Sequence, residues 1–234
     1  MGLVFRFKEF EINQQGCAMK INTDGVLLGA LVHLELPTRI LDIGTGTGVI
    51  AMMLAQRFPE ASVDSVEIDE AAYQASLLNF QNSKFNSRIQ GYSGAFEDLI
   101  VREKYDLIVS NPPFYTNSLH NPDARKKLAR HTDFDFFDKL LHFSNKNLSV
   151  NGQLTLILPV ELAEYVVSEG LKVNLYLAKK IELKSFKDTE VIRSIITLSK
   201  VQHDQITEEF IIYESKGVYS QAYKELLKPF FLAF

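Results

Sequence analysis

Residues 39–48 read RILDIGTGTG, a short apolar run that ends in three alternating glycines. The apolar run predicts a buried strand, and Thr47 to Phe58 follows with the apolar spacing of a helix. Glycines at 44 and 46 allow the backbone to turn tightly and to approach a ligand closely. The stretch therefore predicts a strand–loop–helix unit of an α/β sheet, with a ligand at the loop.

Strand and helix signals alternate along the central region, as they do in a parallel sheet with crossover helices. Further strands are expected at 61–68, 88–93, 105–110 and 153–160, and helices at 26–34, 70–84, 134–148 and 161–168. Asn151-Gly152 predicts a turn into the strand at 153–160. Two β-rich runs, 175–186 and 191–201, predict an antiparallel hairpin that closes one edge of the sheet. We expect an α/β, Rossmann-like fold with a seven-stranded, mostly parallel sheet, an antiparallel C-terminal hairpin and helices on both faces.

Composition sets the class of protein. The chain has 234 residues, of which 46% are hydrophobic and 23% are charged, which is ordinary for a globular protein. No repeat or linker is visible, so we expect a single domain over 1–234. It comprises an N-terminal arm with a short helix (1–38), a ligand-binding core (39–170) and a β-rich C-terminal part (171–234). The apolar end of the chain, residues 230–234, is expected to dock on the body.

Cysteine content and the N-terminus indicate the compartment. Cys17 is the single cysteine, which precludes an internal disulfide and a multi-cysteine metal site, and fits a reducing environment. No signal peptide is apparent, and no apolar run is long enough to cross a bilayer. We therefore expect a cytoplasmic protein without membrane or metal partners, and a monomer. The net charge of −4 is unfavourable for a nucleic-acid partner unless positive charge is clustered.

Two acidic residues narrow the ligand expected at the glycine loop. Asp42 directly precedes the glycines and would repel a phosphate group, and Val49 stands where a dinucleotide site has glycine or alanine. An acid there suits an ammonium-bearing ligand, so Asp42 is expected to contact the cofactor. Glu67 ends the next strand, where an acid can hydrogen-bond ribose hydroxyls. S-adenosylmethionine, a nucleoside with an amino-acid tail instead of phosphates, fits both features. The alternative leaves Glu67 as a solvated turn residue, while Asp69 is the expected N-cap of the following helix.

The sequence Asn111-Pro112-Pro113-Phe114 follows directly on the strand at 105–110. Two prolines cannot continue a central strand, so the chain leaves the sheet with an amide and an aromatic ring at the exit. Ligands bind at the carboxyl ends of strands in open α/β sheets, and this turn suits a planar ligand with an NH2 group. Taken alone, the four residues could also be an ordinary strand-to-loop turn.

The glycine loop, the acid Glu67 and the sequence Asn111-Pro112-Pro113-Phe114 occur in the order and at the distances seen in the class I S-adenosylmethionine-dependent methyltransferases. The chain resembles that family over most of its length. In that family the Asn-Pro-Pro-aromatic sequence is similar to that of enzymes that methylate an exocyclic or amide nitrogen. The resemblance implies that the Asn111 side-chain oxygen and the Pro112 carbonyl accept hydrogen bonds from the target NH2. It implies further that Pro113 belongs to the same catalytic turn and that Phe114 stacks on the target.

The N-terminal arm carries a narrower resemblance. Residues 19–30, MKINTDGVLLGA, resemble the corresponding segment of the bacterial tRNA adenine-N6 methyltransferases, which act on adenine 37 beside the anticodon of tRNA(Val). The resemblance implies that Lys20 and Thr23 lie at the methionine end of the cofactor, although residues 23–25 could simply cap a helix. Asp98 is a candidate for the cofactor adenine, but Ala95 stands where relatives tend to have an acid.

Several acceptors remain open. Phe114, where a tyrosine would resemble protein glutamine methyltransferases, favours a nucleobase, and residues 1–38 are too few for the helical domain of those enzymes. The densest positive cluster follows the catalytic turn and predicts RNA contact, with the target base flipped out. Its residues are Arg125, Lys126, Lys127 and Arg130. Adenine N6 in tRNA is the preferred acceptor. The alternatives are guanine N2 in rRNA, the N5 of a protein glutamine, and an RNA-binding module without catalysis.

Overall fold

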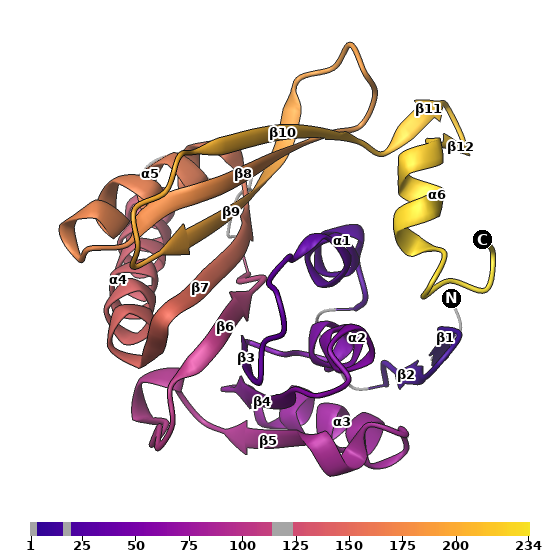
Figure 1. Cartoon of the computed structure of the whole chain (residues 1–234), viewed down its shortest axis with the longest axis horizontal. Coiled ribbons are helices and arrows are strands. Elements are labelled where there is room, and N and C mark those ends of the chain that lie inside the picture. The colour runs from indigo at the N-terminus through magenta and orange to yellow at the C-terminus, as the bar shows by residue number, and fades with distance from the viewer. Residues whose placement is uncertain (1–3, 16–19, 114–123) are drawn as a thin grey trace.

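The computed structural model describes residues 4–15, 20–113 and 124–234, and for 124–133 it describes the backbone alone. A central sheet runs through the molecule with helices on both sides (Figure 1). Its strands are β3 (Arg39–Ile43), β4 (Ser62–Glu67), β5 (Ile89–Ser93), β6 (Tyr105–Ser110), β7 (Leu148–Leu158), β8 (Tyr176–Lys184), β9 (Val191–Ser199) and β10 (Ile206–Ile211). They lie in the order β10-β8-β9-β7-β6-β3-β4-β5, which confirms the predicted α/β architecture.

Two groups of helices cover the two faces of the sheet. The first comprises α1 (Thr23–Leu31), α2 (Val49–Arg57) and α3 (Glu70–Gln81); the second comprises α4 (Ala124–Asn147) and α5 (Val160–Lys172). Alternate strand residues face the two sides: Leu107 and Val109 of β6 pack with the first group, and Ile108 packs with the second. Burial on both faces explains why the central strands read as continuous apolar runs in the sequence.

The sheet has one strand more than predicted. β5, β4, β3, β6 and β7 run parallel to one another, and the pairings β7–β9 and β9–β8 are antiparallel, as expected of the C-terminal hairpin. However, β10 adds to β8 in parallel and forms the edge that the hairpin was expected to close. Its sequence, ITEEFI, hides the strand because consecutive glutamates break the alternation. Those glutamates pair across the strands with lysines of β8, Glu208 with Lys179 (3.0 Å) and Glu209 with Lys184 (2.5 Å).

Strand β7 begins at Leu148, earlier than predicted, and continues through Asn151-Gly152. The prediction of a turn at these two residues is therefore wrong. Tyr105 pairs with Leu148 but Leu107 pairs with Gln153, so the register shifts within this part of β7. The Asn-Gly pair lies in that irregular part, and a Cβ on Gly152 would come within 2.8 Å of the Tyr105 carbonyl oxygen. A bulge absorbs the extra residues, and the chain stays in the sheet.

The N-terminal arm and the C-terminal segment pack on each other (Figure 1). Strands β1 (Val4–Arg6) and β2 (Glu11–Asn13) form a small antiparallel pair, as do β11 (Tyr213–Ser215) and β12 (Val218–Tyr219), before α6 (Gln221–Leu227). Phe7 bridges to Phe231, and Lys8 Nζ donates to the Lys228 and Phe234 carbonyls at 2.6 and 2.8 Å. The expected docking of the apolar C-terminus is confirmed.

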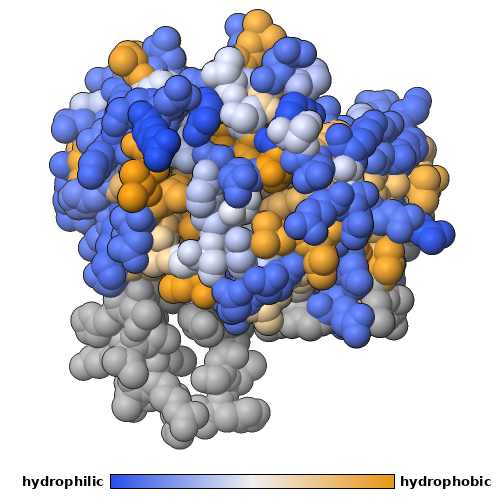
Figure 2. All heavy atoms as spheres, turned by 90° about the horizontal axis from the view of Figure 1, so that it is seen from below, coloured by the Kyte–Doolittle hydropathy of each residue, from blue (hydrophilic) through white to orange (hydrophobic). Residues whose placement is uncertain are grey.

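The surface mixes residue types. On the face shown in Figure 2, hydrophobic residues lie interspersed with hydrophilic ones. Within the described ranges, no helix is long and apolar enough to span a bilayer.

Candidate active site

The predicted site residues meet at the carboxyl edge of β3, β4, β5 and β6. Three hydrogen bonds join these strand ends to one another. Gly44 N donates to Val66 O (2.9 Å), Gly94 N donates to Glu67 O (2.8 Å), and Ser110 Oγ donates to Ile43 O (2.8 Å). The glycine loop, the acid after β4, the turn after β5 and the Asn111 turn therefore share one rigid edge.

The glycine loop is open on its outer side. Gly44 and Gly46 have φ of 71° and 57°, and nothing lies within 4 Å of a Cβ placed on either. Gly48 is needed for a different reason, because a Cβ there would come within 2.4 Å of the Phe80 ring of α3. The loop thus leaves free space in front of its backbone while the start of α2 packs closely behind it.

Glu67 is directed back at this loop. Its side chain is largely buried, with 8% of the residue exposed, and its two oxygens accept from Gly46 N (2.8 Å) and Asp69 N (3.0 Å). A solvated turn residue would not be buried in this way. Asp69 is the N-cap of α3, as predicted, since its carboxylate accepts from Ala72 N at 2.8 Å.

Asp42 lies beneath the loop. It is fully buried and accepts from Thr45 Oγ1 (2.6 Å) and from Ala51 N in α2 (3.2 Å). Burial raises the pKa of its carboxyl from 3.8 to about 7, against the lowering effect of these two bonds. Its carboxylate offers no exposed surface to a ligand, so its contribution is to hold the loop from inside.

Asn111 is half-buried between the end of β6 and α1. Its Nδ2 lies 3.5 Å from the position that a Cβ would take on Gly25, in the first turn of α1. Pro112 is buried and Pro113 exposed, and Phe114 lies outside the described residues. The helix is capped by Asn22, whose side chain accepts from Gly25 N at 2.8 Å, and not by residues 23–25 as expected.

The remaining predicted residues are exposed or lie outside the described side chains. Lys20 and Thr23 are exposed at the start of α1, and Asp98 is exposed at the end of a 3₁₀ turn, Phe96–Asp98, that follows β5. Asp98 also lines a cavity of about 820 Å³, but this cavity extends to Arg39 and Tyr105 at the amino ends of β3 and β6 and is not lined by the glycine loop or Glu67. The positive cluster falls in the first turns of α4, and the side chains of its members lie outside the described part. These are Arg125, Lys126, Lys127 and Arg130.

Comparison with known proteins identifies the family. The model of the methyltransferase small domain matches residues 19–172. A tRNA1(Val) (adenine(37)-N6)-methyltransferase of Pedobacter heparinus is 49% identical over 98% of both chains. Proteins of the same description from Christiangramia forsetii and Actinobacillus pleuropneumoniae are 40% and 38% identical, over 97% of each chain. This chain belongs to that methyltransferase family.

Solved structures of methyltransferases share the fold. A predicted O-methyltransferase from Agrobacterium tumefaciens aligns with a TM-score of 0.70, covering 88% of this chain and 96% of its own, at 17% identity. A methyltransferase from Pyrococcus furiosus aligns with a TM-score of 0.58, covering 80% and 91%, at 21% identity. The fold is that of the class I methyltransferases, as the sequence resemblance implied.

Two residues that support the site in this family member were not singled out from the sequence. Asn79 of α3 is 4% exposed; its Nδ2 donates to Thr47 O (2.9 Å) and Asn13 O (3.1 Å), and its Oδ1 accepts from Asn13 N (2.9 Å). It thereby joins the N-terminal arm to the glycine loop. A buried asparagine among apolar helix positions is a poor helix former, which was the available signal. Arg193 of β9 pairs with Asp24 of α1 at 2.9 Å.

The geometry of the edge fits a methyl donor of the nucleoside type. The open space before Gly44 and Gly46 admits a ligand close to the backbone, and Glu67 keeps lone pairs beyond its two internal bonds. Across the described ranges, no three His, Cys, Asp or Glu side chains gather into a possible metal site.

Proposed function

We propose that this chain transfers a methyl group from S-adenosylmethionine to N6 of adenine 37 in tRNA(Val). The observation that carries the proposal is that Asn111 and the open glycine loop lie at the same carboxyl edge of the sheet, where hydrogen bonds join the strand ends. Full-length similarity to relatives described as tRNA1(Val) (adenine(37)-N6)-methyltransferases supports the acceptor.

The cofactor is assigned to the glycine loop and its surroundings. S-adenosylmethionine, when bound, supplies a methyl group activated on a sulfonium. Gly44 and Gly46 let the backbone approach it, and Glu67 receives the ribose hydroxyls. Asp98 is proposed for the adenine, and Lys20 and Thr23 for the methionine end.

The Asn111 turn is proposed to hold the acceptor amine. The Asn111 side-chain oxygen and the Pro112 carbonyl accept the two N–H groups, which directs the nitrogen lone pair toward the methyl donor. Pro113 keeps the turn rigid, and Phe114 stacks on the base. The rate gain comes from positioning and from stabilising the charge that develops on nitrogen. No strong base is needed, since the proton can leave after transfer.

The RNA is proposed to reach this turn with adenine flipped out of its stack. Arg125, Lys126, Lys127 and Arg130 would contact its phosphates, because they follow the turn along the chain. We further propose that the protein works as a cytoplasmic monomer, with residues 1–234 as a single methyltransferase domain.

The decisive experiment analyses the modified nucleoside. A tRNA(Val) transcript is incubated with the protein and methyl-labelled S-adenosylmethionine, digested, and examined by mass spectrometry. We expect label in N6-methyladenosine, and none in a transcript with guanosine at position 37. Label in N2-methylguanosine, in protein glutamine, or in no product would overturn the proposal.

A further inference from the structure

A second pocket lies in the C-terminal part of the molecule, away from the glycine loop. It has a volume of about 370 Å³ and is lined by Phe186, Tyr213, Lys216, Gly217 and Tyr219. Phe186 follows β8, and the other four residues belong to the β11–β12 pair and its turn. The function proposed above does not use this pocket.

Its aromatic wall is a ladder of rings. Phe186 and Tyr213 have centroids 5.7 Å apart, Tyr213 and Tyr219 stack at 5.1 Å, and Tyr219 stacks on Tyr223 at 4.5 Å with only 6° between the planes. Tyr223 is buried, and Phe234 packs edge-on against it. Packing against Tyr223 and Phe234 therefore orders the rings before any ligand binds, which lowers the entropy cost of binding.

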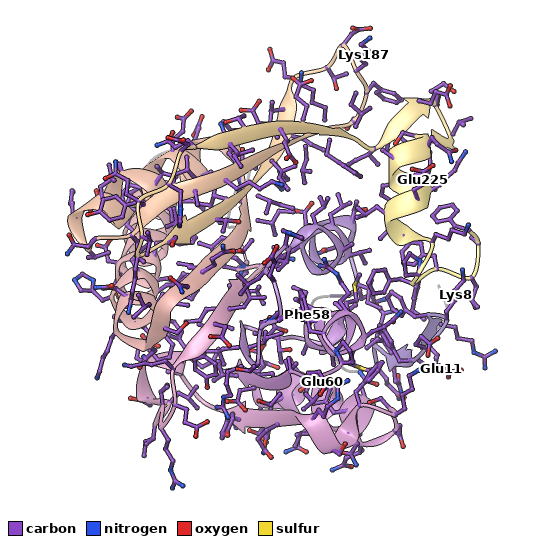
Figure 3. All side chains as sticks on the ribbon, viewed as in Figure 1. Lys8, Glu11, Phe58, Glu60, Lys187 and Glu225 are labelled. Atoms are coloured by element: carbon purple, nitrogen blue, oxygen red, sulfur yellow. The ribbon has the colours of Figure 1, made fainter. Side chains whose placement is uncertain are left out.

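The rim of the pocket is open and carries two exposed lysines beside the exposed acids Asp188, Glu190 and Glu214. Gly217 has φ of 81°, and a Cβ placed on it would meet nothing within 4 Å, so the hairpin turn leaves space beside the rings. Lys216 next to it is exposed, and Lys187 extends outward from the tip of the loop between β8 and β9 (Figure 3). Neither lysine pairs with an acid in the part of the chain that the structure describes, whereas nearby Lys184 pairs with Glu209.

The pocket and Asn111 lie toward the same edge of the sheet. β8 runs in the direction of β6, and Lys184 pairs with Ile211 just before the pocket residues. With strands about 4.8 Å apart and a rise of about 3.3 Å per residue, the pocket lies on the order of 20 Å from Asn111. A nucleotide other than the flipped adenine would therefore reach it.

We propose that this pocket binds an unpaired base of the RNA substrate, stacked on Phe186 at the open end of the ring ladder, since Tyr213 and Tyr219 already have ring partners on both sides. The neighbouring phosphates contact Lys216 and Lys187. Aromatic faces combined with lysines are the usual means of holding single-stranded nucleic acid, and stacking accepts any base. The inference rests on the proposed function, since it presupposes an RNA substrate.

Kinetics with a tRNA(Val) transcript test the pocket. Phe186→Leu keeps apolar volume but removes a ring face, and Lys216→Ala removes the charge. Each is expected to raise the KM for tRNA about five- to tenfold, while kcat and the Kd of S-adenosylmethionine stay at wild-type values. Matched controls are Leu171→Ala and Lys172→Ala at the end of α5, exposed residues at the opposite edge of the sheet, which should leave KM unchanged.

Photocrosslinking supplies an independent readout. Transcripts that carry 4-thiouridine in the anticodon arm should crosslink to peptides containing Phe186, Tyr213 or Tyr219. A wild-type KM for tRNA in both pocket variants, together with no such crosslink, would overturn the inference. The same result is expected if the pocket binds a protein segment instead of RNA. If wild-type protein fails to methylate the transcript, the proposed function itself fails; if it methylates normally and the variants match it, the pocket assignment alone fails.

Discussion

Glu67 at the end of β4 accepts a hydrogen bond of 2.8 Å from the backbone N–H of Gly46, 21 residues earlier in the chain. The acid and the glycine loop therefore form one unit before any ligand binds. Such preorganisation allows the remaining lone pairs of the carboxylate to meet ribose hydroxyls without a rearrangement of the loop.

Replacing Glu67 by Gln should weaken cofactor binding. One carboxylate oxygen becomes an NH2 group, which must face either Gly46 N–H or Asp69 N–H and cannot accept from it. We expect the Kd of S-adenosylmethionine, measured by calorimetry, to rise at least about tenfold. The control Glu60→Gln alters an exposed acid in the turn after α2 and should bind normally. Wild-type affinity in Glu67→Gln would argue against the ribose assignment.

Replacing Asn111 by Ala should abolish transfer without loss of the cofactor. The amide oxygen is assigned to the target amine, so its removal should lower kcat by roughly 10²- to 10³-fold. The Kd of S-adenosylmethionine should stay within about twofold of wild type, because the glycine loop and Glu67 remain intact. Methyl incorporation and calorimetry measure the two quantities. A large loss of cofactor affinity would instead make Asn111 a cofactor or structural residue.

Asn79→Leu should loosen the arm from the glycine loop. The change leaves the buried Thr47 O without its partner and removes the two partly buried bonds to the backbone of Asn13. The free energy of unfolding, from urea denaturation, should fall by about 2–4 kcal/mol. Hydrogen exchange at the Asn13 amide should become faster. Asn82→Leu, at an exposed position one turn later, is the matched control. An equal fall in the free energy of unfolding in both variants would show that Asn79 does not join the arm to the glycine loop.

Asp42→Asn should change how stability depends on pH. The folded-state pKa of Asp42 is raised from 3.8 to about 7, so the folded protein holds a proton that the unfolded chain releases. The stabilising contribution is therefore complete below pH 4 and is lost as pH rises through 7. Asn cannot ionise, and its amide oxygen can accept the bonds from Thr45 and Ala51.

The free energy of unfolding of Asp42→Asn, relative to wild type, should thus increase between pH 4 and pH 8. The gain should be on the order of a few kcal/mol. Denaturation curves at these two pH values provide the measurement. Asp204→Asn, which changes an exposed carboxylate, should parallel wild type. Parallel curves for Asp42→Asn would show that its pKa is not raised.

The strands that matter for the site could be predicted because their signals are local. Tyr105–Ser110 is found as predicted, and Asp69 caps α3 as expected, since burial on both faces and capping chemistry are written in neighbouring residues. The extra strand β10 could not be predicted, because its place depends on pairing with β8 and on ion pairs with Lys179 and Lys184. The same holds for the cap of α1, where Asn22 competes with three other plausible residues.

The α/β order, the tight glycine loop and the stiff exit at Asn111 could all be predicted from local sequence, because glycine permits the positive φ angles of the loop and proline fixes φ at the exit. Which polar groups face a ligand and which face the protein depends on the folded arrangement. Asp42 turns inward to Thr45, Glu67 reaches back to Gly46, and Asn79 joins the arm to the loop. The last two contacts join residues 21 and 32 positions apart, which come together only when the chain folds, and buried polar groups must then find partners within reach.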